Sequence, residues 1–197
     1  MRVTTLCGSH HPASTNAIVL GEIADRLREA GVTVDAIDTR ADVDAFRPHL
    51  VDDPPPGVKV VRRAFESSDA VVISVPEYAG GVPGWIKNIT DWMVGSASLY
   101  ERPVAVLSSA TSGGAHAIVD LARTLTWQGA HVVVTCGIQA PLTKTNTGHV
   151  TDPATIAELD RVAGAVLDAI RNGGDRAAEL AAEALEPLGI DQFDRRT

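Results

Sequence analysis

Short apolar runs alternate along the chain with longer segments whose apolar residues recur at every third or fourth position. The runs are rich in Val, Ile and Leu, as is typical of strands buried in a sheet, and they lie at residues 3–7, 32–37, 70–75, 103–107 and 131–135. The segments with helical spacing lie at residues 15–30, 58–66, 83–93, 115–128 and 152–172. The pattern therefore predicts five strands that alternate with five helices.

This alternation predicts an α/β fold with one parallel sheet that is covered by helices on both faces. Because crossovers between parallel strands are right-handed, the ligand crevice of such a sheet lies beyond the carboxyl ends of its strands. We expect one such domain over residues 1–172 and a helical extension over residues 173–197. In the extension, Leu180, Ala184 and Leu188 share one helical face, which packs either on the body or on a partner subunit.

The loop after the first predicted strand is rich in groups that can hold a phosphate. Gly8 allows close approach of the backbone, and the polar side chains that follow it are Ser9, His11, Ser14, Thr15 and Asn16. The helix that begins here adds unpaired backbone amides and the positive end of its dipole. We therefore predict a phosphate site. The alternative is that Ser14 or Thr15 only caps the helix and that the loop is a polar turn.

Two further loops follow the third and fourth predicted strands and should reach the same edge of the sheet. Residues 76–88 place an aromatic side chain beside two glycines, so backbone groups can reach the edge of a planar ligand while Tyr78 presents its face. Residues 108–114 again combine hydroxyls with paired glycines. Each loop is alternatively a simple turn. The predicted ligand contacts from the two loops are Pro76, Glu77, Tyr78, Ala79, Ser108, Ser112 and Gly113.

The charge distribution favours an anion site only at the start of the chain. The formal net charge is −8, and ten acidic residues stand against five basic ones from Asp152 onward, whereas no acid occurs between Met1 and Gly21. A charge this negative repels nucleic acids and anionic membranes, so we expect neither as a partner. The acid-free start, in contrast, is compatible with a bound phosphate.

Several other classes of protein find no support in the sequence. The two cysteines are too few for a disulfide framework or a zinc site, and of the six histidines only His10 and His11 are close together, so no metal is expected. No Gly-x-Ser-x-Gly nucleophile motif, Walker loop or dinucleotide fingerprint occurs. Neither a signal-peptide apolar region nor a run of about 18 apolar residues is present, and we expect a soluble, cytoplasmic protein.

The quoted loops resemble motifs of one family, the NADPH-dependent FMN reductases, which include quinone, azo-dye and chromate reductases. The resemblance covers about residues 1–172. The family's Gly-Ser-x-Arg-x-x-Ser-x-Asn is matched by Gly8, Ser9, Ser14 and Asn16. Its Pro-Glu-Tyr-Asn, Pro-Gly, Leu-Lys-Asn and Asp-Trp segments are matched by Pro76, Glu77, Tyr78, Pro83, Gly84, Lys87, Asn88, Asp91 and Trp92.

The resemblance implies a flavodoxin-like three-layer sandwich with five parallel strands in the order 2-1-3-4-5. It also implies FMN as cofactor, NADPH or NADH as electron donor, and a small-molecule acceptor such as free flavin or a quinone. The first loop would hold the phosphate, residues 77–79 would border the ring through their backbone, and residues 108–113 would line its pyrimidine side. Since the flavin carries the hydride chemistry, no catalytic side chain is expected. The family further implies a homodimer or homotetramer, with residues 85–93 near the subunit contact.

Three positions depart from the family's motifs: His11 replaces arginine, Ala79 replaces asparagine, and Gly81 stands where serine is frequent. Loss of the arginine removes a fixed positive charge beside the phosphate, which leaves open whether FMN is held tightly or exchanges as a substrate. Two alternatives therefore stay open. One is a flavodoxin-type electron carrier that does not oxidise NAD(P)H, and the other is a flavin-free member that acts as an interaction protein.

Overall fold

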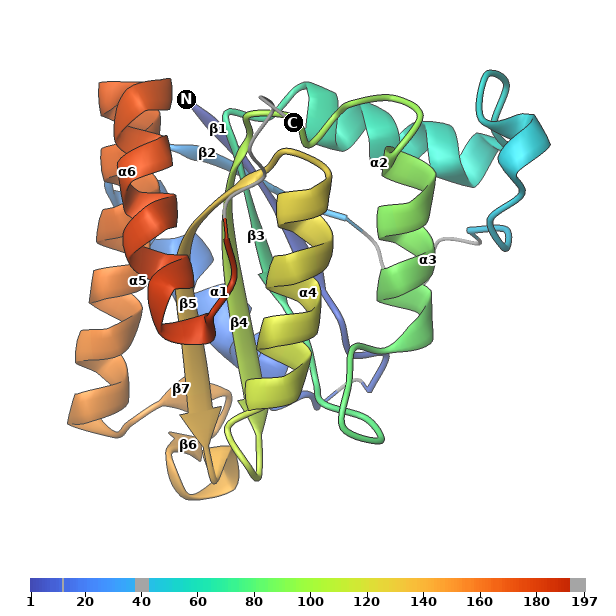
Figure 1. Ribbon diagram of the computed structural model, residues 1–197. Helices are drawn as coiled ribbons and strands as arrows, with labels where there is room; N and C mark the ends of the chain where they lie inside the picture. Colours follow the sequence, from blue (N-terminus) through green and yellow to red (C-terminus); the bar gives the residue numbers. More distant parts are fainter. Residues whose placement is uncertain (12, 38–42, 192–197) are drawn as a thin grey trace.

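A computed structural model describes residues 1–11, 13–37 and 43–191 and places five parallel strands in one sheet (Figure 1). The order of the strands across the sheet is β2-β1-β3-β4-β5, which confirms the predicted order and fold class. The strands are β1 (Arg2–Cys7), β2 (Thr33–Ala36), β3 (Ala70–Ser74), β4 (Pro103–Ala110) and β5 (His131–Gln139). All five residues of β3 are buried, as expected for a strand with a neighbour on each side and helices on both faces.

Helices cover both faces of the sheet and give the sandwich its three layers. Two of them, α1 (Thr15–Glu29) and α5 (Pro153–Asn172), share one hydrophobic cluster with the sheet. The other face carries α2 (Pro56–Glu66), α3 (Gly84–Met93) and α4 (Ala115–Trp127). Among the described residues, no helix has the length and apolar character needed to span a membrane.

The predicted C-terminal extension contains α6 (Gly174–Leu185) and the short 3-10 helix η3 (Glu186–Leu188), and α6 packs on the chain's own α5 and β5. Its buried face consists of Ala177, Leu180, Ala181 and Leu185. The predicted face shares Leu180 with the buried face but is otherwise rotated around the helix, because Ala184 and Leu188 are only half-buried. An alanine-rich helix offers several faces of similar hydrophobicity, so spacing alone does not select among them.

Residues expected near a subunit contact in α3 belong instead to the core of the chain. Trp92 is fully buried, Ile89 and Met93 are nearly so, and the Trp92 Nε1 donates to the Asp44 carbonyl at 2.8 Å. Asn88 contacts the same segment, since its Nδ2 donates to the Asp44 carbonyl at 3.0 Å. The side chains of Ile89, Trp92 and Met93 are therefore core residues, and the hydrogen bonds of Trp92 and Asn88 fasten the segment before the 3-10 helix η1 (Pro48–Leu50) to α3.

A small antiparallel hairpin after β5 and the 3-10 helix η2 (Pro141–Thr143) had no counterpart in the sequence prediction. Its strands are β6 (Thr145–Asn146) and β7 (His149–Val150). The Glu22 carboxylate of α1 accepts hydrogen bonds from His149 Nδ1 at 3.2 Å and Val150 N at 3.3 Å. Two-residue polar strands carry no hydrophobic periodicity, which is why the pattern missed them.

Replacing Leu107 tests the packing of the sheet against α1 and α5. Leu107 lies in β4 with 0% of its surface exposed, so Leu107→Ala should lower the free energy of unfolding by about 3 kcal/mol. Leu142 is 82% exposed, and Leu142→Ala should change that energy by less than about 0.5 kcal/mol. Urea denaturation of the two variants measures both values, and similar losses would contradict the assigned core.

Candidate functional site

Loops that follow β1, β3 and β4 meet at the carboxyl edge of the sheet, because these three strands are neighbours. The first loop approaches the third strand closely: a Cβ on Gly8 would lie 2.8 Å from the Val75 Cα, so only glycine fits. Gly8 N also donates to the Ser74 carbonyl at 2.6 Å. The predicted meeting of the loops at one edge is therefore present in the structure.

Asn16 joins the start of α1 to two strands. Its Oδ1 accepts from Ser74 Oγ and from Ser109 N, both at 2.9 Å, and its Nδ2 donates to the Ser109 carbonyl at 2.9 Å. The residue is 3% exposed. This arrangement differs from the predicted phosphate contact, because the side-chain oxygen is engaged by the strands and a single amide hydrogen is left for a ligand.

The hydroxyls of the first loop surround the N-terminus of α1. Ser14 is the N-cap, and its Oγ accepts from Asn16 N at 3.2 Å. Ser9 is mostly buried, and Thr15 is half-buried at the first helical position. The first turn of α1 contains no acidic residue. The helix cap and the phosphate site are thus compatible, since a cap satisfies only some of the first amides.

His11 and His10 lie on the outside of the same loop. His11 is exposed, and its Nδ1 accepts from Ala13 N at 3.1 Å, so the neutral ring carries its hydrogen on the outward Nε2. The His10 ring lies 4.4 Å from the Trp85 ring, and Trp85 Nε1 donates to the Gly8 carbonyl at 3.1 Å. Trp85 thus contacts the first loop, which no pattern in the sequence predicts, because the residue's only signal is an aromatic side chain at a helix start.

The second loop contains a tight turn with an exposed aromatic side chain. Tyr78 and Gly81 exchange two backbone hydrogen bonds, of 3.1 and 3.0 Å. Between them, Ala79 and Gly80 have left-handed φ angles of 51° and 73°. Pro76 is buried beneath the turn, whereas Tyr78 is 57% exposed. The turn therefore presents backbone groups and an aromatic face together.

Glu77 points its carboxylate at the start of α4. Oε2 accepts from His116 N at 2.9 Å and Ala117 N at 3.3 Å, and Oε1 accepts from Ser112 Oγ at 3.2 Å. Burial opposes ionisation, but these hydrogen bonds hold the pKa of Glu77 below its usual value. The side chain is thus directed at the third loop, while the predicted ligand contact of this residue is through its backbone.

The predicted residues of the third loop differ in how deeply they are buried. The Ser108 side chain is fully buried under Gly114, where an added Cβ would lie 1.9 Å from Ser108 Oγ. The Ser108 hydroxyl therefore lies beneath the loop, and the predicted contact of this residue with the ring is left to its backbone. Ser112 is exposed and Gly113 half-exposed, and both lie beside the N-terminus of α4.

Thiol and metal chemistry receive no support from the described residues. Burial raises the pKa of Cys7 and, together with Glu158, raises the pKa of Cys136 to about 11, so both thiols stay protonated near neutral pH. Among the residues that the structure describes, no group of three or more potential metal ligands occurs.

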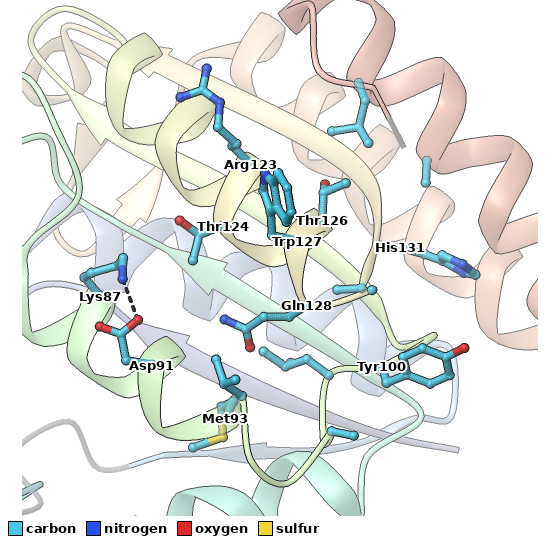
Figure 2. Close-up of a pocket in the computed structure, with 17 residues that line it drawn as sticks. Lys87, Asp91, Met93, Tyr100, Arg123, Thr124, Thr126, Trp127, Gln128 and His131 are labelled. Atoms are coloured by element: carbon cyan, nitrogen blue, oxygen red, sulfur yellow. Dashed lines mark hydrogen bonds and ion pairs between the residues drawn. The ribbon is translucent and has the colours of Figure 1, made fainter. Parts of the chain in front are cut away.

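A cavity of about 800 Å³ lies away from the three loops, between α3 and the C-terminal half of α4 (Figure 2). Lys87 and Asp91 form an ion pair at one side of it, and Tyr100 and His131 lie toward the other. The cavity contains none of the predicted site residues. The loops at the sheet edge remain the candidate site, since hydroxyls, a helix N-terminus and an exposed aromatic ring converge there.

The residues of these loops are compatible with FMN in charge and in hydrogen-bonding groups. The acid-free start of α1, with Ser9, Ser14 and Thr15, suits a dianionic phosphate. The left-handed turn at Ala79 exposes backbone groups beside Tyr78, as a planar polar ring requires.

Several known proteins are similar to this chain in sequence, in fold or in both. A quinone reductase of Escherichia coli K12 is 28% identical over 169 residues, which cover 81% of this chain and 89% of that protein. The flavoenzyme FerB of Paracoccus denitrificans, an NAD(P)H:(acceptor) oxidoreductase, is 27% identical with a TM-score of 0.75, covering 87% of this chain and 97% of that one. A flavodoxin of Streptococcus pneumoniae TIGR4 is 15% identical with a TM-score of 0.59, covering 85% and 98%, and shares the fold alone.

Asn16→Asp tests the junction between α1 and the strands. A carboxylate oxygen would replace the amide nitrogen that lies 2.9 Å from the Ser109 carbonyl, and the two oxygens would repel. The free energy of unfolding should fall by at least about 3 kcal/mol. Asn146 is exposed in β6, and Asn146→Asp should leave it within about 0.5 kcal/mol. Equal values in urea denaturation would argue against the junction.

A family model also matches most of the chain. The model of the NADPH-dependent FMN reductases matches residues 1–141, which include all three loops and the strands that carry them. Together with the strand order and the site geometry, this match shows that the chain belongs to the NADPH-dependent FMN reductase family.

Proposed function

We propose that the protein transfers a hydride from NAD(P)H to FMN and passes the electrons on to a small quinone. As a member of its family it is a flavin-dependent oxidoreductase that uses FMN and NAD(P)H. The observation that carries the proposal is the convergence of an acid-free helix N-terminus and an exposed tyrosine turn at one sheet edge. The quinone is favoured because the similar Escherichia coli protein is a quinone reductase.

Each loop has a distinct task in the proposed site. Ser9, His11, Ser14 and Thr15, with the remaining amide hydrogen of Asn16, bind the phosphate. The backbone from Pro76 to Ala79 orients the ring, Tyr78 shields it from water, and Ser112 and Gly113 border its pyrimidine side. When bound, FMN supplies the hydride-accepting chemistry. The chain itself therefore has to bind and align rather than to donate or remove protons.

We assign FMN binding to residues 1–172 and treat residues 173–197 as an extension of that domain. We also propose a cytoplasmic location, because Cys7 and Cys136 are both free, as in a reducing compartment. An electron carrier of flavodoxin type receives no specific support, since the flavodoxin compared above shares only the fold.

We propose that the protein forms a homodimer, or a homotetramer built from it, through the outer surface of α3 and α4. The cavity there is lined by apolar residues such as Met93, Leu99 and Leu185. Val94 at the end of α3 is 62% exposed and Trp127 at the end of α4 is 70% exposed. Large exposed apolar residues beside a cavity with a partly apolar lining are typical of a protein contact.

Visible spectroscopy of the purified protein tests the proposed activity. The protein should bind added FMN and, without oxygen, lose the visible flavin band when NADPH or NADH is added. Steady NAD(P)H consumption with a quinone should follow, which a pure electron carrier would not support. A protein that neither binds nor reduces FMN would contradict the proposal.

Substitution of Val94 tests the proposed contact between subunits. Val94→Glu should convert the dimer to a monomer, because a buried unpaired carboxylate opposes association. Val60 on α2 is exposed to a similar extent, 60% against 62%, and Val60→Glu should leave the dimer intact. Light scattering during gel filtration gives both masses, and a Val94→Glu dimer would refute this contact.

A further inference from the structure

Glu77 supplies the helix cap that α4 lacks in its own sequence. The N-cap of α4 is Gly114, which has a left-handed φ of 69° and no side chain to accept from the first amides. The Glu77 carboxylate takes this place from a different loop, accepting from His116 N and Ala117 N. Its second oxygen accepts from Ser112 Oγ. One carboxylate thus satisfies three donors on the third loop and α4.

The contact requires the charged form of Glu77. A carboxylate at a helix N-terminus is stabilised by the helix dipole and by charge-assisted hydrogen bonds, which are stronger than those to a neutral group. The lowered pKa of Glu77, which burial opposes and the hydrogen bonds produce, agrees with this geometry. At neutral pH the two loops are therefore held together by an ionised group.

Glu77 is also the residue directly before the turn proposed to border the flavin ring. The turn closes through the backbone bonds between Tyr78 and Gly81, so its position depends on what holds its two ends. One end follows buried Pro76 and is anchored through Glu77, and the other leads into α3. A shift of Glu77 would move the turn relative to Ser112 and Gly113.

We infer that the Glu77 carboxylate is a positioning residue that sets the spacing between the two loops that border the flavin ring. It acts by capping α4, while its own backbone lies at the ring. This inference rests on the proposed function, because the loops are assigned to the flavin there.

Two isosteric variants separate positioning from general stability. Glu77→Gln and Asp152→Asn each neutralise a carboxylate that caps a helix, and Asp152 accepts from Thr155 N at 2.8 Å at the start of α5. Glu77→Gln should weaken binding of FMN about tenfold, consistent with the loss of one charge-assisted hydrogen bond. Its bound flavin should also show a visible spectrum closer to that of free FMN. Asp152→Asn should keep the FMN dissociation constant within about twofold of the wild-type value. This should hold even if its melting temperature falls as far as that of Glu77→Gln.

A milder variant covers the case in which Glu77→Gln does not fold. Glu77→Asp keeps the charge and the backbone but shortens the side chain, so it cannot reach His116 N and Ser112 Oγ together, and it should weaken FMN binding by about threefold with the same direction of spectral change. Wild-type affinity and spectrum in Glu77→Gln, or in Glu77→Asp if that alone folds, would overturn the inference. So would an equal loss of affinity in Asp152→Asn. Those results leave the proposed function intact, whereas absence of FMN binding by the wild-type protein overturns both.

Discussion

The buried amide of Asn16 fixes the geometry on which the candidate site depends. Parallel strands end at one edge, but their loops share a binding surface only if the first helix starts at a defined place over them. Asn16 provides that constraint because three hydrogen bonds connect its side chain to Ser74 and Ser109. A buried polar group that loses its hydrogen-bond partner costs free energy, because no water can replace the partner. The start of the helix is therefore held closely against both strands.

The sequence predicted the fold well because its signals are local and periodic. Strands such as β3 are continuous apolar runs, and the amphipathic spacing of α1 and α5 is regular. The small hairpin at 145–150 escaped prediction because its strands pair two residues each and depend on a distant carboxylate, Glu22. Contacts between polar groups that are far apart in the chain produce no periodic pattern in its sequence.

The same distinction explains what could be foreseen of the site. Loop composition located the converging hydroxyls and the tyrosine turn, and the family motif drew attention to Asn16 and Glu77. It did not reveal that the Asn16 side chain faces two strands or that the Glu77 carboxylate caps α4. Both facts depend on tertiary distances. The burial of the Ser108 side chain could not be foreseen for the same reason, since only the folded loop places Gly114 over it.

The three departures from the family motif have different physical consequences. Ala79 keeps the left-handed φ of 51°, a conformation that asparagine adopts more easily, so the turn survives at a cost of about 1 kcal/mol. Gly81 leaves room for Asp120, because an added Cβ would lie 3.1 Å from its Oδ2. His11 offers a single outward donor in its neutral form where arginine offers a charged fork. Only the third change weakens the attraction for a phosphate.

The N-termini of α1 and α4 at this edge are not equivalent, and the difference favours α1 as the place where an anion can bind. The start of α4 already holds the chain's own carboxylate, Glu77, which uses its first amides and offsets its dipole. The start of α1 has no acid in its first turn, and its cap, Ser14, is neutral. A chain with a net charge of −8 repels anions over most of its surface. It can still hold a phosphate at α1, because local amides and hydroxyls act at hydrogen-bond distance while the distant acids are screened.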